Sequence, residues 1–457
     1  MPKQKTVQKF SPQSLIKHGP LSNIAELSKN RNLAYLRAKR LYYLLENIGG
    51  TCEERVVFTP KLFKQQQYCL SGKTAADAFE AERMLIKLDE HLAYMPLGPA
   101  VTDAMARLEA ISTVRIDGLA PRSKDLLVLD SLFNAEQTRY FNYDITESNF
   151  CTKSASLEAF YYLETLRWIT DTVHLGFQFS PQFILDVHSR CLYNKDASET
   201  GIRFREKDFE HGKDAQSTGA FQPPSADELM DYLTDLCDFI NTPCFSPIVQ
   251  VGYMHFQFES IKPFRAAMDR TGRALCHALF RARGLTENVI PPIALLPAID
   301  TTYHAMSLLP YDKTENFEES NTPAVLNRWI EFCADSTSAI QKIEKNYLNI
   351  FEALKNHWNE QAGKLSEGSV ARTILDYLPG HPILTVEAAC KFTGKSFGAC
   401  NDALKRLEND GVLTLIDNKG STNTRLFEAK KATAALNRME ETLFSSPPVS
   451  RSLVKPV

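Results

Sequence analysis

The sequence predicts a mainly α-helical protein with two or three domains, and three observations lead to this prediction. The chain has 457 residues, and domains commonly span about 100–200 residues. Across most of the chain, apolar residues recur every three or four positions, which is the spacing of one face of a helix. Alternation of apolar and polar residues, which indicates strands, occurs in residues 199–224 and 412–427.

The composition narrows the classes of function. Hydrophobic residues make up 44% of the chain, which is ordinary for a globular protein, and the formal net charge of −3 favours neither nucleic acid nor a membrane surface. No charged-then-apolar leader opens the chain, and no apolar run approaches the roughly 20 residues that span a bilayer. The ten cysteines include no C-x-x-C pair. We therefore expect a cytoplasmic protein without membrane contact and without a metal site.

Residues 1–80 are predicted as an N-terminal extension that is basic and helical. Residues 1–40 contain nine Lys/Arg and one acid, Glu26. Such an arm can bind nucleic acid, but it is also typical of a solvated terminus, and both interpretations stay open.

Residues 81–360 are predicted to form a helical domain. A Pro/Gly break in "YMPLGP" separates its first two helices, and Ser180-Pro181 predicts the start of another, because serine caps helices and proline suits their first turn. Residues 200–224, within "ETGIRFREKDFEHGKDAQSTGAFQPP", suit a small β-hairpin.

Residues 369–430 differ in character and predict a winged helix-turn-helix, followed by a C-terminal tail over residues 431–457. Short helices separated by Thr393-Gly394-Lys395 precede an alternating hairpin. In the second helix the expected buried stripe is Phe397, Cys400, Leu404 and Leu407. The residues expected to contact DNA or a partner are Lys395, Asn401, Lys405 and Arg406. From 370 to 430 there are eight Lys/Arg and seven Asp/Glu, so both DNA and a protein partner stay open, with protein contact favoured.

The stretch "HFQFESIKPFRAAMDRTGRALCHALF", residues 255–280, predicts a helix, a short loop and a second helix. Arg270 and Arg273 stand three apart where the second helix begins. Arginines at a helix N-terminus are suited to phosphate, because they add bidentate charged contacts to the backbone N–H groups. The pattern over residues 262–273 is therefore typical of a site for an anionic ligand.

This stretch resembles the signature of the Fic (Fido) family, H-P-F-x-[D/E]-G-N-G-R-x-x-R, whose members transfer AMP from ATP to a protein hydroxyl. Pro263, Phe264, Arg270 and Arg273 match, and "HFQFESI" resembles the helix that precedes the signature. The resemblance implies a Fic helical domain over residues 81–360, nucleotide binding by Arg270 and Arg273, and a homodimer.

Three further segments extend the resemblance. "EAISTVRIDGL" resembles the family's inhibitory helix motif, with Thr113, Asp117 and Gly118 as the regulatory residues. Residues 200–224 resemble the flap hairpin, and "RWIEFC" resembles the helix that closes the domain. The resemblance implies that the carboxylate of Asp117 can reach Arg273.

The positions that carry the family's chemistry are substituted. Lys262 occupies the position of the histidine base, and a lysine with an ordinary pKa of about 10.4 is protonated at pH 7. Ala266 replaces the carboxylate that holds Mg²⁺, and Ala267-Met268-Asp269 replaces Gly-Asn-Gly.

We interpret the chain as a degenerate Fic protein that lacks AMP transfer and acts as a binding or regulatory module with a protein partner. Two alternatives stay open. One is a divergent transferase that uses ATP with Mg²⁺ or another phosphate-containing donor, and the other is a DNA-binding regulator. Whether the chain is an enzyme is therefore left undecided by its sequence.

Overall fold

The computed structural model describes residues 60–66, 68–135, 154–192, 203–209, 223–299, 322–363, 365–416 and 425–445. All of them belong to one compact unit, Cys52–Val457. Most of the predicted N-terminal extension, the centre of the predicted flap and the end of the predicted tail lie outside these residues. None of the described helices is both long and apolar enough to cross a membrane.

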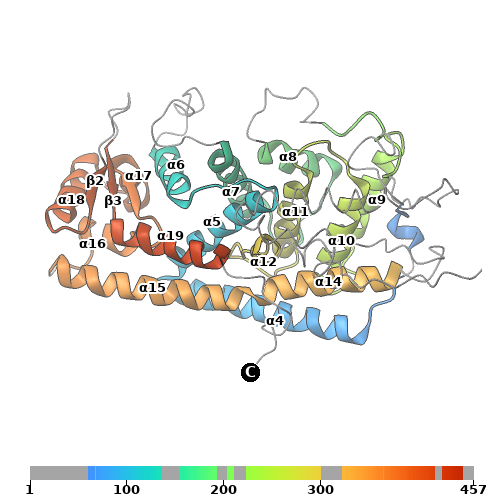
Figure 1. The fold of residues 1–457 in the computed structure, drawn as a ribbon, viewed down its shortest axis with the longest axis horizontal. Coiled ribbons are helices and arrows are strands. Elements are labelled where there is room, and N and C mark those ends of the chain that lie inside the picture. The colour runs from blue at the N-terminus through green and yellow to red at the C-terminus, as the bar shows by residue number, and fades with distance from the viewer. Residues whose placement is uncertain are drawn as a thin grey trace, which may run out of the picture. The chain divides into compact units, whose positions relative to one another are not determined.

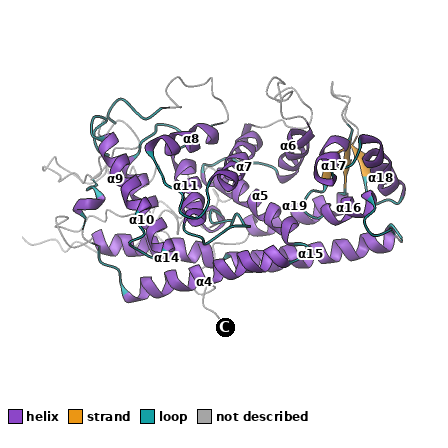
Figure 2. Cartoon of the chain, turned by 180° about the vertical axis from the view of Figure 1, so that it is seen from behind, coloured by secondary structure: helices purple, strands orange, loops and turns teal. Residues whose placement is uncertain are grey.

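Helices dominate the fold, as predicted (Figures 1 and 2). The first group is the 3-10 helix η2 (Phe63–Gln65) and the helices α4 (Gly72–Tyr94), α5 (Gly98–Ile116), α6 (Ser123–Ala135), α7 (Ser154–Thr172), α8 (Pro181–Cys191) and α9 (Leu229–Asn241). The second group is α10 (Pro247–Ile261), α11 (Met268–Ala282), α12 (Leu295–Ile299), α14 (Thr322–Ser338) and α15 (Ile340–Gln361). Helix α4 crosses the domain boundary predicted at residue 80, and the predicted boundaries stay predictions.

Local sequence signals explain where several helices begin. The hydroxyl of Ser180 accepts a hydrogen bond from the N–H of Phe183, and Pro181 occupies the first turn of α8. The start predicted from Ser180-Pro181 is therefore confirmed. The hydroxyl of Ser71 caps α4 in the same way.

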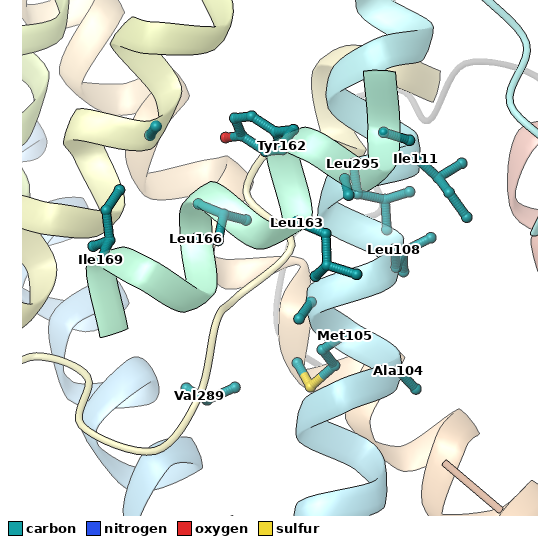
Figure 3. Close-up of a cluster of buried hydrophobic side chains, with 14 of the residues drawn as sticks. Ala104, Met105, Leu108, Ile111, Tyr162, Leu163, Leu166, Ile169, Val289 and Leu295 are labelled. Carbon is teal, nitrogen blue, oxygen red and sulfur yellow. The ribbon is translucent and has the colours of Figure 1, made fainter. Parts of the chain in front are cut away.

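Helix α5 lies in the centre of the core, packed against α7 and α12 (Figure 3). It contributes the buried side chains Ala104, Met105, Leu108 and Ile111 to one apolar cluster, whose other members include Tyr162, Leu163, Leu166 and Ile169 of α7 together with Val289 and Leu295. Burial of this apolar area fixes the helix in place, at roughly 25 cal/mol per Å² removed from water. The orientation of α5 matters because Asp117 follows its last residue.

The C-terminal elements are α16 (Val370–Tyr377), β1 (Ile383–Thr385), α17 (Val386–Thr393), α18 (Phe397–Asn409), β2 (Thr414–Ile416), β3 (Leu426–Glu428) and α19 (Lys430–Ser445). The strands form an antiparallel sheet in the order β1-β3-β2, with Leu384 and Leu415 both opposite Phe427. Helices and a terminal hairpin follow one another as the sequence predicted, and the assignment to winged helix-turn-helix proteins stays a prediction.

These C-terminal elements contact α5 and α6 directly. A Cβ on Gly380 would lie 2.8 Å from the Cα of Ala100, so this close approach to α5 requires glycine. The carbonyl of Gly380 accepts a hydrogen bond from Arg107, and His381 Nε2 lies 2.6 Å from Asp103 Oδ2. The N-terminal half of α5 is therefore anchored to the C-terminal elements, and Asp117 follows the opposite end of the helix.

Candidate functional site

The candidate site is the loop between α10 and α11, and its backbone is strained at both ends. Lys262 ends α10 with φ 49° and ψ 64°, and Ala267 precedes α11 with φ 46° and ψ 26°. They are the two non-glycine residues with positive φ in the part of the chain that the structure describes. A residue with a Cβ loses roughly 1–2 kcal/mol in this conformation. The backbone at Ala267 therefore has a conformation that favours glycine.

Phe264 anchors the middle of the loop. Its ring is buried and stacks on the His188 ring, with centroids 3.5 Å apart and planes inclined by 5°. The Nδ1 atom of His188 lies 2.9 Å from the hydroxyl of Thr271, and that hydroxyl donates to the carbonyl of Ala267 at 2.9 Å. This chain of contacts fixes the loop to α8 and to the first turn of α11.

Two arginines fasten residues 203–209 to the loop. Arg205 is buried; its backbone N–H donates to Pro263 O and its Nε donates to Lys262 O, both at 2.9 Å. Arg265 donates to the carbonyl oxygens of Lys207 at 3.2 Å and Asp208 at 2.9 Å. Burial lowers the pKa of Arg205, and Asp208 partly opposes this effect.

The part of the predicted flap within 203–209 contains no strand, and residues 210–222 lie outside the described residues. The predicted hairpin therefore stays a prediction. The positioning role of Arg205 was missed from the sequence, because its partners are carbonyl groups of a distant loop, which no sequence pattern reveals.

The two signature arginines are both held by carboxylates. Asp117, which follows α5, accepts from Arg270 Nε and, at 3.2 Å, from Arg273 Nη2. The same Nη2 atom lies 3.4 Å from the carbonyl oxygen of Thr113. Glu158 of α7 forms an ion pair with the Nη1 atom of Arg270. The expected contact of Asp117 with Arg273 is thus present, while its contact with Arg270 and the participation of Glu158 were not foreseen.

This cluster is largely shielded from water and balanced in charge. The side chains of Arg270 and Arg273 are 10% and 6% exposed, against 19% for Asp117 and 24% for Glu158. Burial alone would lower the pKa of each arginine, but the carboxylates, Asp117 first among them, raise both pKa values above the ordinary one. Two cations and two anions leave little net charge to attract a phosphate.

The segment that resembles the inhibitory motif is held by a buried polar network. The carboxylate of Glu109 on α5 accepts from the N–H of Ala294 at 2.7 Å and the hydroxyl of Thr113 at 3.3 Å, and lies 3.0 Å from His277 Nε2. The pKa of the adjacent Tyr162 is raised by burial and by the charge of Glu109. Gly118 ends the segment with φ 85°, a conformation suited to glycine. Thr113 and Asp117 thus both contact Arg273, and Gly118 directly follows Asp117.

The loop offers no ligand set for a divalent cation. Ala266 is exposed and carries only a methyl group, whereas Mg²⁺ requires oxygen ligands. Among the described residues, no three His, Cys, Asp or Glu side chains are grouped so as to bind a metal ion. The residues at this position therefore do not fit the Mg²⁺ that accompanies ATP.

The predicted contact residues of α18 divide into two groups. Lys395 and Lys405 are exposed, whereas Asn401 accepts a hydrogen bond from Arg425 Nη2 at 2.6 Å. Arg406 is also exposed, and its Nε lies 3.7 Å from Asp410 Oδ2.

One prediction for α18 is wrong. Cys400, Leu404 and Leu407 are buried as expected, but Phe397 is 53% exposed. Phe397 is the first residue of α18, directly after its cap Ser396, and lies ahead of the turns whose apolar side chains enter the core. Helical spacing alone extended the buried stripe one turn too far.

The site thus presents two arginines from a helix–loop–helix, opposed by the carboxylate that follows α5. Residues 178–280 match the model of the Fic/DOC family, and the chain therefore contains a Fic/DOC domain.

Two solved structures are similar to this chain. One is a Fic family protein from Desulfovibrio desulfuricans G20, with 15% identity, a TM-score of 0.43, and coverage of 80% of this chain and 98% of that chain. The other is a fragment of Fic-1 from C. elegans, with 17% identity, a TM-score of 0.35, and coverage of 59% and 73% respectively. No curated protein sequence matches the chain.

Proposed function

We propose that this chain is a degenerate Fic protein that does not transfer AMP and that acts as a binding or regulatory module. The substituted loop carries this proposal, and the carboxylate clamp, by which we mean Asp117 and Glu158 bound to Arg270 and Arg273, adds to it. A nucleotide phosphate would have to displace two carboxylates from side chains that are largely buried. The displaced carboxylates would then lie close to the negatively charged phosphate. In a site shielded from water, this repulsion costs several kcal/mol of binding free energy.

The substituted loop supports the same proposal. A transferase of this family needs a base, an oxygen ligand for Mg²⁺ and a glycine-lined turn around the phosphates. Lys262, Ala266 and Ala267 occupy these positions, and neither alanine offers a hydrogen-bonding side chain. Asp269 adds a further negative charge at the start of α11.

The alternative is a divergent transferase that the clamp holds inactive. A paired arginine occurs in both cases, so the wild-type chain cannot distinguish them. The decisive protein is the variant Asp117→Ala, Glu158→Ala, in which both arginines lose these partners. This variant is incubated with labelled ATP, Mg²⁺ or Mn²⁺ and a cell lysate. We expect that it incorporates no AMP into itself or into other proteins.

Two control variants make the experiment interpretable. The first adds Lys262→His, Ala266→Asp, Ala267→Gly, Met268→Asn and Asp269→Gly, which restores the family signature and serves as the positive control. The second adds Arg273→Ala to the open-clamp variant. Labelling of the open-clamp variant that disappears with Arg273→Ala would overturn the proposal in favour of a transferase.

Protein contact is the mode of binding that we favour over DNA for the C-terminal elements. Two of the four predicted contact residues, Asn401 and Arg406, already have partners within the chain, and the exposed Phe397 adds an apolar contact beside Lys395. DNA binding depends on phosphate neutralisation, which such a surface supplies weakly.

A further inference from the structure

Two cysteines lie against one another where α17 and α18 pack together. Cys390 belongs to the second half of α17, and Cys400 lies near the start of α18. Both are free thiols, and the side chain of Cys390 is hydrogen-bonded to that of Cys400. Cys400 is buried, whereas Cys390 is partly exposed. The pair therefore joins a thiol that solvent can reach to one that is shielded from it.

The hydroxyl of Thr393 orients the shielded thiol. This hydroxyl donates its proton to the carbonyl of Ala389 at 2.6 Å, so its oxygen accepts from the thiol of Cys400, whose sulfur lies 3.2 Å away. The N–H of Lys395 donates to the same oxygen at 3.3 Å. If the thiol of Cys400 lost its proton, the hydroxyl of Thr393 would still have a donor, so no polar group would be left without a partner.

Two thiols in contact, one of them open to solvent, are suited to reversible oxidation. We propose that Cys390 and Cys400 are an oxidation site at which hydrogen peroxide converts the two thiols into a disulfide. The thiolate of Cys390 attacks one oxygen of the peroxide, which gives a sulfenic acid and releases hydroxide. The sulfur of Cys400 gives up its proton and displaces hydroxide from the sulfenic sulfur. The two thiols together lose two protons and two electrons, and one molecule of peroxide becomes two of water.

The surroundings of the pair make this oxidation slow at neutral pH. Burial raises the pKa of Cys390 to about 11, and the hydrogen bond and charge of Cys400 act in the same direction. Because the thiolate is the form that reacts, the rate should increase about tenfold for each pH unit below this pKa. The pair therefore suits sustained exposure to peroxide.

The disulfide would close a short loop at the surface. This loop contains Lys395 and Phe397, which are both exposed. A cross-link restricts local opening of the segment that it closes, so the backbone amides of α17 and of the first turn of α18 should exchange hydrogen more slowly in the oxidised chain. This inference does not depend on the proposed function.

Peptide mapping of the full chain before and after treatment with hydrogen peroxide tests the proposal. The remaining thiols are alkylated, and trypsin, which cleaves after lysine and arginine, then leaves Cys390 in residues 373–391 and Cys400 in residues 396–405. The disulfide therefore joins two separate peptides, which mass spectrometry detects directly in the wild-type chain. We expect this linked pair after oxidation and its loss on reduction. It should form at least about tenfold faster at pH 9 than at pH 7.

Single substitutions give the controls. Cys390→Ser and Cys400→Ser should each abolish the linked peptides. Cys69→Ser, which removes an exposed thiol outside the pair, should leave their yield unchanged. Absence of the linked peptides, a sulfinic acid at Cys390 in their place, or linked peptides that form only after the chain is unfolded in urea would overturn the proposal.

Discussion

Two clusters of charged side chains in this molecule have similar composition and different surroundings. The first is the carboxylate clamp at the loop. The second, which we call the junction cluster, is Asp103, Arg107, Asp130, Arg167 and His381, where the C-terminal elements meet α5, α6 and α7. In the junction cluster Asp130 is 2% exposed and accepts two hydrogen bonds from Arg167, at 2.6 and 3.1 Å.

The difference lies in burial and in backbone strain. The clamp carboxylates are 19% and 24% exposed, and the neighbouring loop contains both of the non-glycine residues with positive φ among those described. The junction cluster joins helices of ordinary geometry and buries its central carboxylate more deeply. Backbone strain tends to occur at functional sites, whereas a deeply buried pair with several hydrogen bonds holds elements together.

Removing one arginine from each cluster should give the largest difference in the free energy of unfolding. Arg167→Met leaves Asp130 buried without its bidentate partner, and breaking a buried pair in this way costs roughly 4 kcal/mol. Arg270→Met should cost less, roughly 2 kcal/mol, because Asp117 keeps its hydrogen bond from Arg273 and Glu158 is 24% exposed. Urea unfolding of the two variants measures both values. If both variants lost the same free energy of unfolding, the carboxylate clamp would contribute as much to the stability of the fold as the junction cluster.

The pH dependence of the junction cluster has a defined sign. Burial raises the pKa of Asp130, but the charges of Arg167, His381 and Arg107 together lower it by more. The pKa of Asp130 is therefore below its ordinary value in the folded protein. Its contribution to stability is therefore present above about pH 4 and is lost as the pH falls toward the folded pKa. Arg167→Met should reduce this acid sensitivity.

Glu440 should have the next largest effect on stability, and its pH dependence has the opposite sign to that of Asp130. It lies on α19 beside the junction, and its carboxylate accepts from the hydroxyl of Ser123 at 2.8 Å. Burial raises the pKa of Glu440 to about 7, although Ser123, Arg107 and Arg115 oppose the rise. Between the ordinary value near 4.3 and pH 7, the folded state binds more protons than the unfolded state, so stability falls as the pH rises.

Glu440→Gln should remove this fall. The variant should be more stable than the wild type at pH 8 by roughly 3 kcal/mol, and similar to it at pH 4.5, because a neutral side chain stays uncharged throughout. Urea unfolding of both proteins at several pH values measures the difference. If the two profiles stayed parallel, Glu440 would be ionised in the folded protein like an ordinary surface carboxylate.

The sequence predicted what local patterns determine. The helical class, the start of α8 at Ser180-Pro181 and the approach of Asp117 to Arg273 could all be inferred from spacing, capping residues or the family resemblance. Glu158 could not, because its partner Arg270 lies on a helix more than a hundred residues later in the chain. The exposure of Phe397 was missed because the end of a buried stripe depends on where the neighbouring helices end.

The smallest effect should come from the strained loop. Ala267 adopts φ 46°, where a Cβ costs about 1 kcal/mol and glycine has no penalty. Ala267→Gly should therefore stabilise the protein by about 1 kcal/mol, less the entropy that glycine gains in the unfolded chain. Gly118→Ala, at φ 85°, is the reciprocal control and should destabilise it by a similar amount. Urea unfolding measures both. If Ala267→Gly were neutral or destabilising, the loop would have relaxed around alanine, and the strain that separates the clamp from the junction cluster would be absent.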